Sequence, residues 1–411
     1  MSSFNEYGFN NQILKSIKDL KFNSPTPIQG KVIPEILSSN IDIIATAQTG
    51  TGKTAAFGLP IIQLTANQSK KIECIILCPT RELCLQITKD LSTYSKHIKN
   101  YKVLPIYGGT KVDTQIKSLK QNPKIIVCTP GRLNDLIKRR RVDFSLVKYF
   151  VLDEADEMLS MGFKSEIDRV LAEVPLDRKI YLFSATLSEK VKKITKTYMQ
   201  KPLLIATSSA NKAADTVKHI YYTSNKNKRY EIIRNIIDLN RNIYAIIFCR
   251  TRRETKEISS SLISDNYRAK VLNGDLSQSE RDEVMDQFRK KHINILVATD
   301  VASRGIDVDN LSHIINYNLP DDPEVYVHRS GRTGRAGNEG LSIVFVSKRE
   351  KHRIKELEKL SKISFVENQV PTESDVFKSQ ISSFSDKIAE APVPSNKDKM
   401  IFEKLYHRLN N

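Results

Sequence analysis

The sequence predicts an α/β protein made of two tandem domains, each built around a parallel β-sheet. Short runs rich in isoleucine and valine recur along the chain with helix-length segments between them. Runs that are apolar on both faces indicate a sheet covered by helices on both sides. A small, polar stretch at residues 207–216 interrupts this pattern. The chain has 411 residues, which is more than one hydrophobic core usually organises.

Each expected strand corresponds to one apolar run. The first domain, residues 1–206, contains the runs 41–46, 72–78, 124–128, 148–153 and 179–185. The second domain, residues 217–350, contains the runs 243–249, 293–299, 312–318 and 341–346. Because residues 207–216 are small and polar, we expect them to form a linker between the two domains.

Residues 351–411 are predicted to form a short helical C-terminal extension. Residues 351–362 have a helical pattern, and two later sets of apolar residues fall near one helical face. These sets are Val376, Phe377, Ile381, Phe384 and Ile388, and Ile401, Phe402, Leu405, Tyr406 and Leu409. Short helices must bury an apolar face somewhere. The stripes therefore either pack on the second domain or form a surface for a homodimer or another protein partner.

The charge balance favours a polyanionic partner. Lysine and arginine outnumber aspartate and glutamate by 65 to 47, a formal net charge of +18. Nucleic acid is favoured over a membrane because no lysine-rich amphipathic segment concentrates the charge. A genome that favours lysine codons is the alternative explanation of the charge.

The five cysteines are odd in number and lack CxxC spacing, which is typical of reduced core residues. With no apolar leader or membrane-length apolar run, a cytoplasmic location is expected.

A glycine-rich loop is the first candidate site. AQTGTGKT, residues 47–54, follows a predicted strand and precedes a helical stretch. Glycines let backbone N–H groups turn inward and cradle phosphates at a helix N-terminus. The alternative, a chance glycine-rich turn, does not explain why strand, loop and helix follow in this order. Ala47 replaces the first glycine of the usual GxxxxGK[ST] pattern. Lys53 is expected to reach the outer phosphates, and the Thr54 hydroxyl to ligate Mg²⁺. The predicted nucleotide site comprises Gln48, Thr49, Gly50, Thr51, Gly52, Lys53 and Thr54.

An acidic segment supports this site. KYFVLDEAD, residues 148–156, places Asp153 at the end of a buried strand, and parallel α/β sheets bind ligands at the carboxyl ends of their strands. We expect Asp153 to hold Mg²⁺ opposite Thr54, largely through water, and Glu154 to orient and deprotonate a water that attacks the γ-phosphate. An acidic helix N-terminus would explain the charge but not its position after a buried strand. The sequence therefore predicts nucleotide hydrolysis.

Further segments occur in a recognisable order between about residues 4 and 347. They are FNSPTPIQ (22–29), AQTGTGKT (47–54), PTREL (79–83), GG (108–109), TPGR (129–132), DEAD (153–156), SAT (184–186), IIFCRTR (246–252), QSER (278–281), ATDVASRGID (298–307) and HRSGRTGR (328–335). This ordered set resembles the DEAD-box RNA helicases of superfamily 2, and more weakly their bacterial cold-shock subgroup. The resemblance implies two RecA-like domains and ATP as the nucleotide.

The resemblance also implies roles around the nucleotide. Phe22 and Gln29 would recognise adenine by stacking and by a bidentate amide contact, with Phe4 at the upstream aromatic position; without the family they would be ordinary surface or core residues. Asp307 would meet the ribose. The coupling residues implied by the resemblance, which link the DEAD segment to domain closure, are Asp156, Ser184 and Thr186.

Two segments of the second domain would complete catalysis and RNA binding. The resemblance implies that Arg332 and Arg335 act as arginine fingers, with His328 in the network around Glu154 and the attacking water. The implied RNA-backbone contacts are Thr80, Arg81, Gly108, Gly109, Thr129, Pro130, Gly131 and Arg132 in the first domain, and Gln278, Arg281 and Thr299 in the second. Taken singly, each of these is more simply explained as a turn or a helix cap.

The expected function is therefore that of an ATP-dependent RNA helicase. ATP and RNA together would close the two domains, and the closed state would separate short duplexes locally, without strong sequence preference. The family resemblance points to ribosome assembly or RNA turnover. Two alternatives stay open: an ATP-dependent RNA clamp that acts mainly as an assembly module, and a DNA-stimulated superfamily-2 ATPase.

Overall fold

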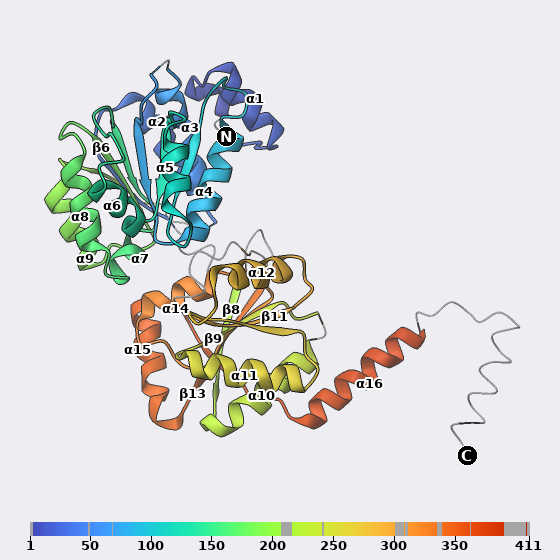
Figure 1. The fold of residues 1–411 in the computed structure, drawn as a ribbon. Coiled ribbons are helices and arrows are strands. Elements are labelled where there is room, and N and C mark those ends of the chain that lie inside the picture. Colours follow the sequence, from blue (N-terminus) through green and yellow to red (C-terminus); the bar gives the residue numbers. More distant parts are fainter. Residues whose placement is uncertain are drawn as a thin grey trace, which may run out of the picture.

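The chain forms two α/β lobes, each around a parallel sheet (Figure 1). This computed structural model describes residues 3–47, 50–67, 69–206, 216–240, 242–300, 308, 311–334, 339–361, 363–389 and 408. Within these residues each sheet has seven strands, and every strand pairs in parallel with its neighbours. The predicted fold class is confirmed.

The first sheet has the strand order β3-β4-β2-β5-β6-β1-β7. Its inner strands are buried except for one terminal residue in three of them, which explains their continuous runs of Ile, Val, Leu and Phe. The strands are β1 (Ile43–Thr46), β2 (Cys74–Leu77), β3 (Val103–Ile106), β4 (Ile125–Cys128), β5 (Tyr149–Leu152), β6 (Lys179–Ser184) and β7 (Leu203–Ala206).

Helices cover both faces of this sheet with separate hydrophobic clusters. One face packs against η1 (Phe4–Tyr7), α1 (Asn11–Asp19), α2 (Pro27–Ser38), α3 (Lys53–Thr65) and α4 (Arg81–Tyr94). The other packs against α5 (Val112–Leu119), α6 (Pro130–Lys138), α7 (Ala155–Ser160), α8 (Lys164–Glu173) and α9 (Glu189–Tyr198).

The second sheet has the order β10-β11-β9-β12-β13-β8-β14. Its strands are β8 (Val217–Thr223), β9 (Ala245–Cys249), β10 (Ala269–Leu272), β11 (Ile295–Thr299), β12 (His313–Asn316), β13 (Gly340–Val346) and β14 (Val366–Glu367). Its helical elements are η3 (Lys226–Lys228), α10 (Arg229–Leu239), α11 (Arg252–Ser264), α12 (Gln278–Arg289), α14 (Pro323–Ser330), η4 (Lys348–Glu350), α15 (Lys351–Ser361) and α16 (Glu373–Ala389). Helices α10 and α11 cover one face, and α12, α14 and α15 the other.

Strand register brings the predicted nucleotide segments to one edge of the first sheet. Thr46, the last residue of β1, lies beside Ser184, the last residue of β6. The Ala47 N–H then donates to the Ser184 carbonyl at 3.1 Å. Strand β5 is the other neighbour of β6 and runs parallel to it, so the residues that follow β5 lie at the same edge. The loop after β1, the DEAD segment and the SAT segment are therefore neighbours.

The described part of the C-terminal extension is mainly helical, as predicted, and it also supplies strand β14, which the sequence pattern did not reveal. Phe365 packs 5.1 Å from the ring of Tyr326 on α14 and 5.7 Å from that of His219 on β8. The buried Tyr326 hydroxyl lies 2.6 Å from His219 Nδ1 and donates to Ser342 Oγ at 2.9 Å. The extension therefore braces α14 from outside the sheet.

The apolar stripe on α16 is only partly buried. Val376 is buried, whereas Phe377 and Ile381 are exposed. Packing on the second lobe therefore accounts for part of the stripe, since Asn235 of α10 donates to the Pro371 carbonyl just before α16 at 2.8 Å. The second predicted stripe, within residues 401–409, lies outside the described residues apart from Arg408.

Five strands were not anticipated from the sequence: β3, β7, β8, β10 and β14. Strands β3, β7 and β10 have partly exposed residues, and β3, β7, β10 and β14 form sheet edges. Edge strands lose the two-sided apolar pattern that marks inner strands. Strand β8 contains Lys218 and His219, which interrupt its apolar run. In the part of the chain that the structure describes, no helix has the length and apolarity that a membrane crossing requires.

We predict that Phe365→Ala destabilises the second lobe by about 1–3 kcal/mol, because it removes a partly buried aromatic ring from Tyr326 and His219. Urea unfolding followed by circular dichroism measures the change. Phe377→Ala is the matched control: Phe377 is 64% exposed, so its loss should cost less than about 0.5 kcal/mol. Equal unfolding midpoints for the two variants would contradict the bracing role of the extension.

Candidate functional site

The glycine-rich loop has the backbone that a phosphate cradle needs. Gly50 and Gly52 have φ values of 82° and 87°, a left-handed conformation that glycine adopts without steric cost. Gly52 caps the N-terminus of α3, so Lys53 and Thr54 form its first turn. Lys53 is buried, as expected for a cation aimed at a ligand rather than at solvent. Gln48 and Thr49 lie outside the described residues.

Gln29 is built into this loop. Its Nε2 donates to the Gly52 carbonyl at 3.1 Å, and its Oε1 accepts from the Thr26 N–H at 2.9 Å. The Thr26 hydroxyl in turn donates to the Thr51 carbonyl at 2.9 Å. A side chain at position 52 would place its Cβ 2.4 Å from Gln29 Nε2, and the φ of 87° would strain any residue other than glycine. A bidentate contact of Gln29 with adenine would use the same two polar atoms and stays a prediction.

Phe22 lies in an aromatic cluster with Phe4 of η1 and Tyr94 of α4. Its ring stacks on that of Phe4 with centroids 6.3 Å apart, and it meets the Tyr94 ring edge-on at 6.3 Å. Phe4 is buried, whereas Phe22 is half-buried. One face of Phe22 is thus held by protein, and its partial exposure is compatible with the predicted stacking on a base.

The acidic segment begins where β5 ends. The Asp153 N–H donates to the Leu77 carbonyl at 2.9 Å, and the Asp153 carboxylate accepts from the Glu154 N–H at 3.0 Å. Burial raises the pKa of Asp153 to about 6, although the charge of Lys53 opposes the shift. A buried carboxylate of this kind is stabilised by a cation. The Thr54 hydroxyl and Asp153 carboxylate are hard oxygen donors, and so they fit Mg²⁺.

Glu154 occupies an unusual backbone conformation. Its φ is 51°, in the left-handed region, and it is the N-cap of α7 without a side-chain capping bond. Left-handed conformation costs a residue with a side chain about 1–2 kcal/mol, and such residues gather at functional sites. The conformation turns the chain sharply from β5 into α7, and the Glu154 carboxylate is not used to cap that helix.

Asp156 joins the DEAD segment to the SAT segment. Its Oδ2 accepts from the N–H groups of Ala185 and Thr186 at 3.1 and 2.9 Å, and from the Thr186 hydroxyl at 3.0 Å. The buried Ser184 hydroxyl donates to the Thr186 carbonyl at 2.7 Å. Because the Ser184 carbonyl also accepts from Ala47, these bonds run without a break from α7 to the start of the glycine-rich loop.

His328 of the second lobe reaches the DEAD helix of the first. Its Nε2 lies 3.7 Å from Asp156 Oδ2, and its Nδ1 lies 3.6 Å from Glu157 Oε2. Although burial favours the neutral ring, Glu157 and Asp156 raise the pKa of His328 above its ordinary value. Protonation therefore strengthens this contact between the lobes. The sequence placed His328 near Glu154; the ion-pair partners in the structure are the next two acids along α7.

Arg329 was missed as a structural support of this region. It is buried, and its guanidinium binds both carboxylate oxygens of Asp300 at 2.6 Å and Asn316 Oδ1 at 2.7 Å. It also lies over the Phe248 ring at 4.8 Å. The quoted segment HRSGRTGR contains Arg329, but a local sequence pattern does not show that this arginine faces the core.

Arg332 follows α14 in a turn anchored to the second sheet. The Arg332 N–H donates to the Arg329 carbonyl at 3.1 Å, and the Thr333 hydroxyl donates to the Leu311 carbonyl. Gly334 has a φ of 68°, and a Cβ there would lie 2.4 Å from Val217 Cγ2. Glycine thus lets the turn lie against β8. Arg335 and Asp307 lie outside the described residues.

The predicted RNA residues of the first lobe lie after β2, β3 and β4. Thr80 caps α4 by accepting from the Leu83 N–H at 3.3 Å. Arg132 donates to the Thr110 carbonyl at 2.9 Å and to Gln115 Oε1 at 3.0 Å, so it holds the loop that carries Gly108 and Gly109. Thr129 is the N-cap of α6, and Pro130 and Gly131 form its first turn. All eight residues share the carboxyl edge of the sheet with the glycine-rich loop.

Two crossed ion pairs join the RNA residues of the two lobes. Arg81 Nη2 lies 3.0 Å from Asp282 Oδ2, and Arg281 Nη2 lies 3.4 Å from Glu82 Oε1. Gln278 begins α12 and donates to Asp282 at 3.0 Å, while Thr299 is buried at the end of β11. The helix N-termini of α4 and α12 therefore face each other across the boundary, and Glu82 and Asp282 are partners that the sequence did not single out.

Comparison with protein families covers both lobes. Residues 26–194 match the family described as DEAD/DEAH box helicase, and residues 228–337 match the family described as helicase conserved C-terminal domain. The ATP-dependent RNA helicase CshA of Listeria monocytogenes is 41% identical over 398 residues, which are 96% of this chain and 76% of that protein. CshA of Geobacillus kaustophilus is 39% identical over 92% of this chain and 81% of its own.

Solved structures with a similar fold also cover most of this chain. Dbp5 L327V of S. cerevisiae bound to RNA and ADP BeF3 has a TM-score of 0.82 at 31% identity, covering 92% of this chain and all of that one. Mss116p bound to ssRNA and AMP-PNP has a TM-score of 0.81 at 32% identity, over 94% of this chain and 86% of that one. A DEAD box protein of Methanococcus jannaschii is 42% identical over 89% and 99%, with a TM-score of 0.52.

We predict that Asp282→Asn loosens the contact between the lobes. Removing one charge of an ion pair between partly exposed groups should cost about 0.2–1 kcal/mol, so the apposed fraction should fall by a factor of up to about five. Energy transfer between dyes attached to one introduced surface cysteine in each lobe measures this fraction, since all five native cysteines are buried. Asp286→Asn is the control, because Asp286 pairs with Lys290 within α12. Equal transfer efficiencies for the two variants would contradict a role for the crossed pairs.

Proposed function

The chain belongs to the DEAD-box ATP-dependent RNA helicases, and we propose that its hydrolytic site is completed across the two lobes when RNA is bound. The observation that carries this proposal is the approach of His328, from α14 of the second lobe, to Asp156 and Glu157 of the first. Because α14 leads directly into the turn with Arg332, the same approach brings arginine to the phosphate edge. Hydrolysis then depends on how the lobes are placed.

ATP is bound by the first lobe in this proposal. The N–H groups of residues 48–54 surround its phosphates, and Lys53 neutralises the outer ones. Phe22 stacks on adenine, and the second N–H of the Gln29 amide is available to the base while the first holds Gly52. Support comes from the positive φ of Gly50 and Gly52 and from the half-buried ring of Phe22. Asp307 contacts the ribose from the second lobe.

Thr54 and Asp153 would hold Mg²⁺, largely through water. When bound, the ion supplies charge neutralisation at the phosphates. The support is chemical, since both donors are oxygens and the pKa of Asp153 is raised by burial. Lys53 lies close enough to oppose that shift, so a positive charge is already part of the site.

Glu154 orients the attacking water and accepts its proton in the proposed reaction. The developing charge on the γ-phosphate is met by Arg332 and Arg335, and an arginine finger typically contributes about 10³- to 10⁵-fold in rate. His328 positions α14 through Asp156 and Glu157. Support comes from the left-handed backbone of Glu154, which leaves its carboxylate out of helix capping.

The hydrogen bonds of Asp156 provide the coupling. A shift of α14 at His328 acts on Asp156, then on Thr186 and Ser184, and finally on Ala47 at the start of the phosphate loop. Each step is a direct contact. We therefore assign Asp156, Ser184 and Thr186 to communication between lobe closure and the nucleotide rather than to chemistry.

RNA lies across both lobes at the edge that carries Arg81, Gly109, Arg132, Arg281 and Thr299. These residues present backbone amides, hydroxyls or guanidinium groups, which contact phosphate and sugar without reading bases. In the crossed ion pairs, the carboxylates of Asp282 and Glu82 bind Arg81 and Arg281. RNA phosphates would replace these carboxylates. The TM-scores of 0.82 and 0.81 with relatives bound to RNA support this placement of the lobes.

Several further features stay proposals. Residues 1–206 form the first domain, 207–216 the linker, 217–350 the second domain and 351–411 the extension. The five free, buried cysteines support a cytoplasmic location. The exposed Phe377 and Ile381 support self-association or a protein partner on α16. Participation in ribosome assembly or RNA turnover is a prediction of the family resemblance.

We predict that Glu154→Gln lowers kcat for ATP hydrolysis by at least about 100-fold, because an amide does not accept the proton of the attacking water. Affinities for ATP and for single-stranded RNA should stay within a few-fold of wild type. Steady-state ATPase assays and fluorescence polarisation with labelled RNA measure the two effects.

Glu173→Gln, at an exposed position on α8, is the matched control and should retain full activity. Wild-type ATPase in Glu154→Gln would remove Glu154 from catalysis. Loss of RNA binding in that variant would show that the substitution acts on folding or on lobe closure instead.

A further inference from the structure

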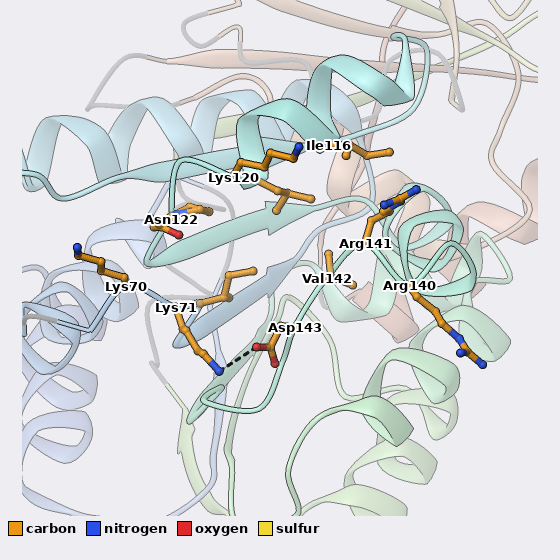
Figure 2. A pocket seen from close by; sticks show the side chains of 12 residues that line it. Lys70, Lys71, Ile116, Lys120, Asn122, Arg140, Arg141, Val142 and Asp143 are labelled. Carbon is orange, nitrogen blue, oxygen red and sulfur yellow. Dashed lines mark ion pairs between the residues drawn. The ribbon is translucent and has the colours of Figure 1, made fainter.

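A basic cleft of about 600 Å³ opens on the first lobe, away from the nucleotide site. Figure 2 shows the side chains that line it. The cleft is formed by residues that precede β2, β4 and β5 and by the end of α5. The glycine-rich loop and the predicted RNA residues follow strands of the same sheet. All these strands are parallel, so the cleft lies at the opposite edge, about 13 Å away along a four-residue strand. Its volume is within the range of ligand sites, about 300–1,000 Å³.

Five cations line this basic cleft: Lys70, Lys71, Lys120, Arg140 and Arg141. Figure 2 shows Lys70 and Lys71 at one end and Arg140 and Arg141 at the other. Asp143 is the one acidic residue among the described residues of the lining, and its carboxylate lies 3.0 Å from Lys71 Nζ.

Asp143 neutralises Lys71 and leaves the other cations unopposed. Hydrogen bonds from Ser145 and the Lys71 charge lower the pKa of Asp143 to about 2, so it stays ionised at neutral pH. In the described ranges of the chain, Lys70, Lys120, Arg140 and Arg141 make no ion pair, whereas Arg139 next to them pairs with Asp135 at 2.9 Å. Four positive charges therefore surround one opening without a protein counter-charge.

The floor of the basic cleft is aliphatic. Ile72, Ile116, Leu119 and Val142 line it, and all four belong to or pack against the hydrophobic cluster on that face of the sheet. Among the described residues of the lining there is no aromatic ring. Such a surface offers burial to aliphatic groups and ion pairs to anionic groups, side by side.

We propose that the basic cleft binds an acidic peptide segment of a partner protein, in which aliphatic side chains alternate with aspartate or glutamate. The aliphatic groups cover the floor, and the carboxylates pair with Lys120, Arg141 and their neighbours. Single-stranded RNA fits less well, because its bases stack on aromatic side chains and its phosphates would leave the aliphatic floor uncovered. The alternative, a solvated lysine-rich surface without a ligand, accounts for the charge but not for its arrangement around an apolar opening.

Binding at this edge leaves ATP and RNA sites free. None of the cleft residues belongs to the proposed nucleotide or RNA machinery, and the sheet separates the two edges. A partner docked here would thus tether the helicase without blocking its reaction.

The test is a selection of random 12-residue peptides, displayed on phage, against the immobilised full chain. Wild type is compared with Lys120→Glu/Arg141→Glu and with the matched control Lys190→Glu/Lys193→Glu, which makes the same charge change at exposed positions of α9. Enriched peptides and a labelled single-stranded RNA are then titrated against all three proteins by fluorescence polarisation. Thermal melting confirms folding, and Lys120→Gln/Arg141→Gln replaces the reversal variant if that variant is unfolded.

We expect wild type and control to enrich peptides with alternating aliphatic and acidic residues, and the cleft variant to bind them at least tenfold more weakly with unchanged ATPase activity. Absence of acidic peptides from the enriched set, or equal binding to wild type and cleft variant, would overturn the proposal. A tenfold loss of RNA binding confined to the cleft variant, without peptide enrichment, would assign the cleft to RNA instead.

Discussion

One carboxylate oxygen, Oδ2 of Asp156, holds together the parts on which the rest of the structure depends. It accepts three hydrogen bonds from Ala185 and Thr186 and lies 3.7 Å from His328 of the other lobe. Hydrogen bonds to a charged acceptor are about twice as strong as neutral ones, so this oxygen fixes the SAT segment firmly. The position of α14 and the position of the phosphate loop are thus linked through a single side chain.

The supports around this oxygen are rigid for identifiable reasons. Arg329 is clamped by Asp300 and Asn316 inside the second lobe, and Phe365 braces α14 from the extension. The turn after α14 lies against β8 because position 334 is glycine. The second lobe therefore presents its arginine-bearing turn as one preformed unit. Regulation is left to the placement of the two lobes, where the crossed ion pairs are few and weak enough to be exchanged for RNA phosphates.

The sequence predicted what depends on local pattern. Buried inner strands such as 74–77 and 125–128, and the loop before Lys53, were found because their apolar runs and glycine spacing are local signals. Edge strands such as 103–106 were missed because partial exposure erases that signal. The buried orientation of Arg329 and its pairing with Asp300 depend on contacts between segments distant in the chain, which no local pattern contains. The same holds for the pairing of Arg81 with Asp282, although Arg81 itself was singled out.

In the proposed reaction, RNA completes the hydrolytic site by bringing the lobes together. The most direct test is the steady-state ATPase rate of the full chain alone, with single-stranded RNA, and with DNA of the same sequence, at two salt concentrations. Strong stimulation by RNA only is the predicted result, and it should fall as salt rises because each counterion released from a phosphate gains less entropy at a higher bulk salt concentration. Equal stimulation by DNA, or no stimulation by either nucleic acid, would contradict it.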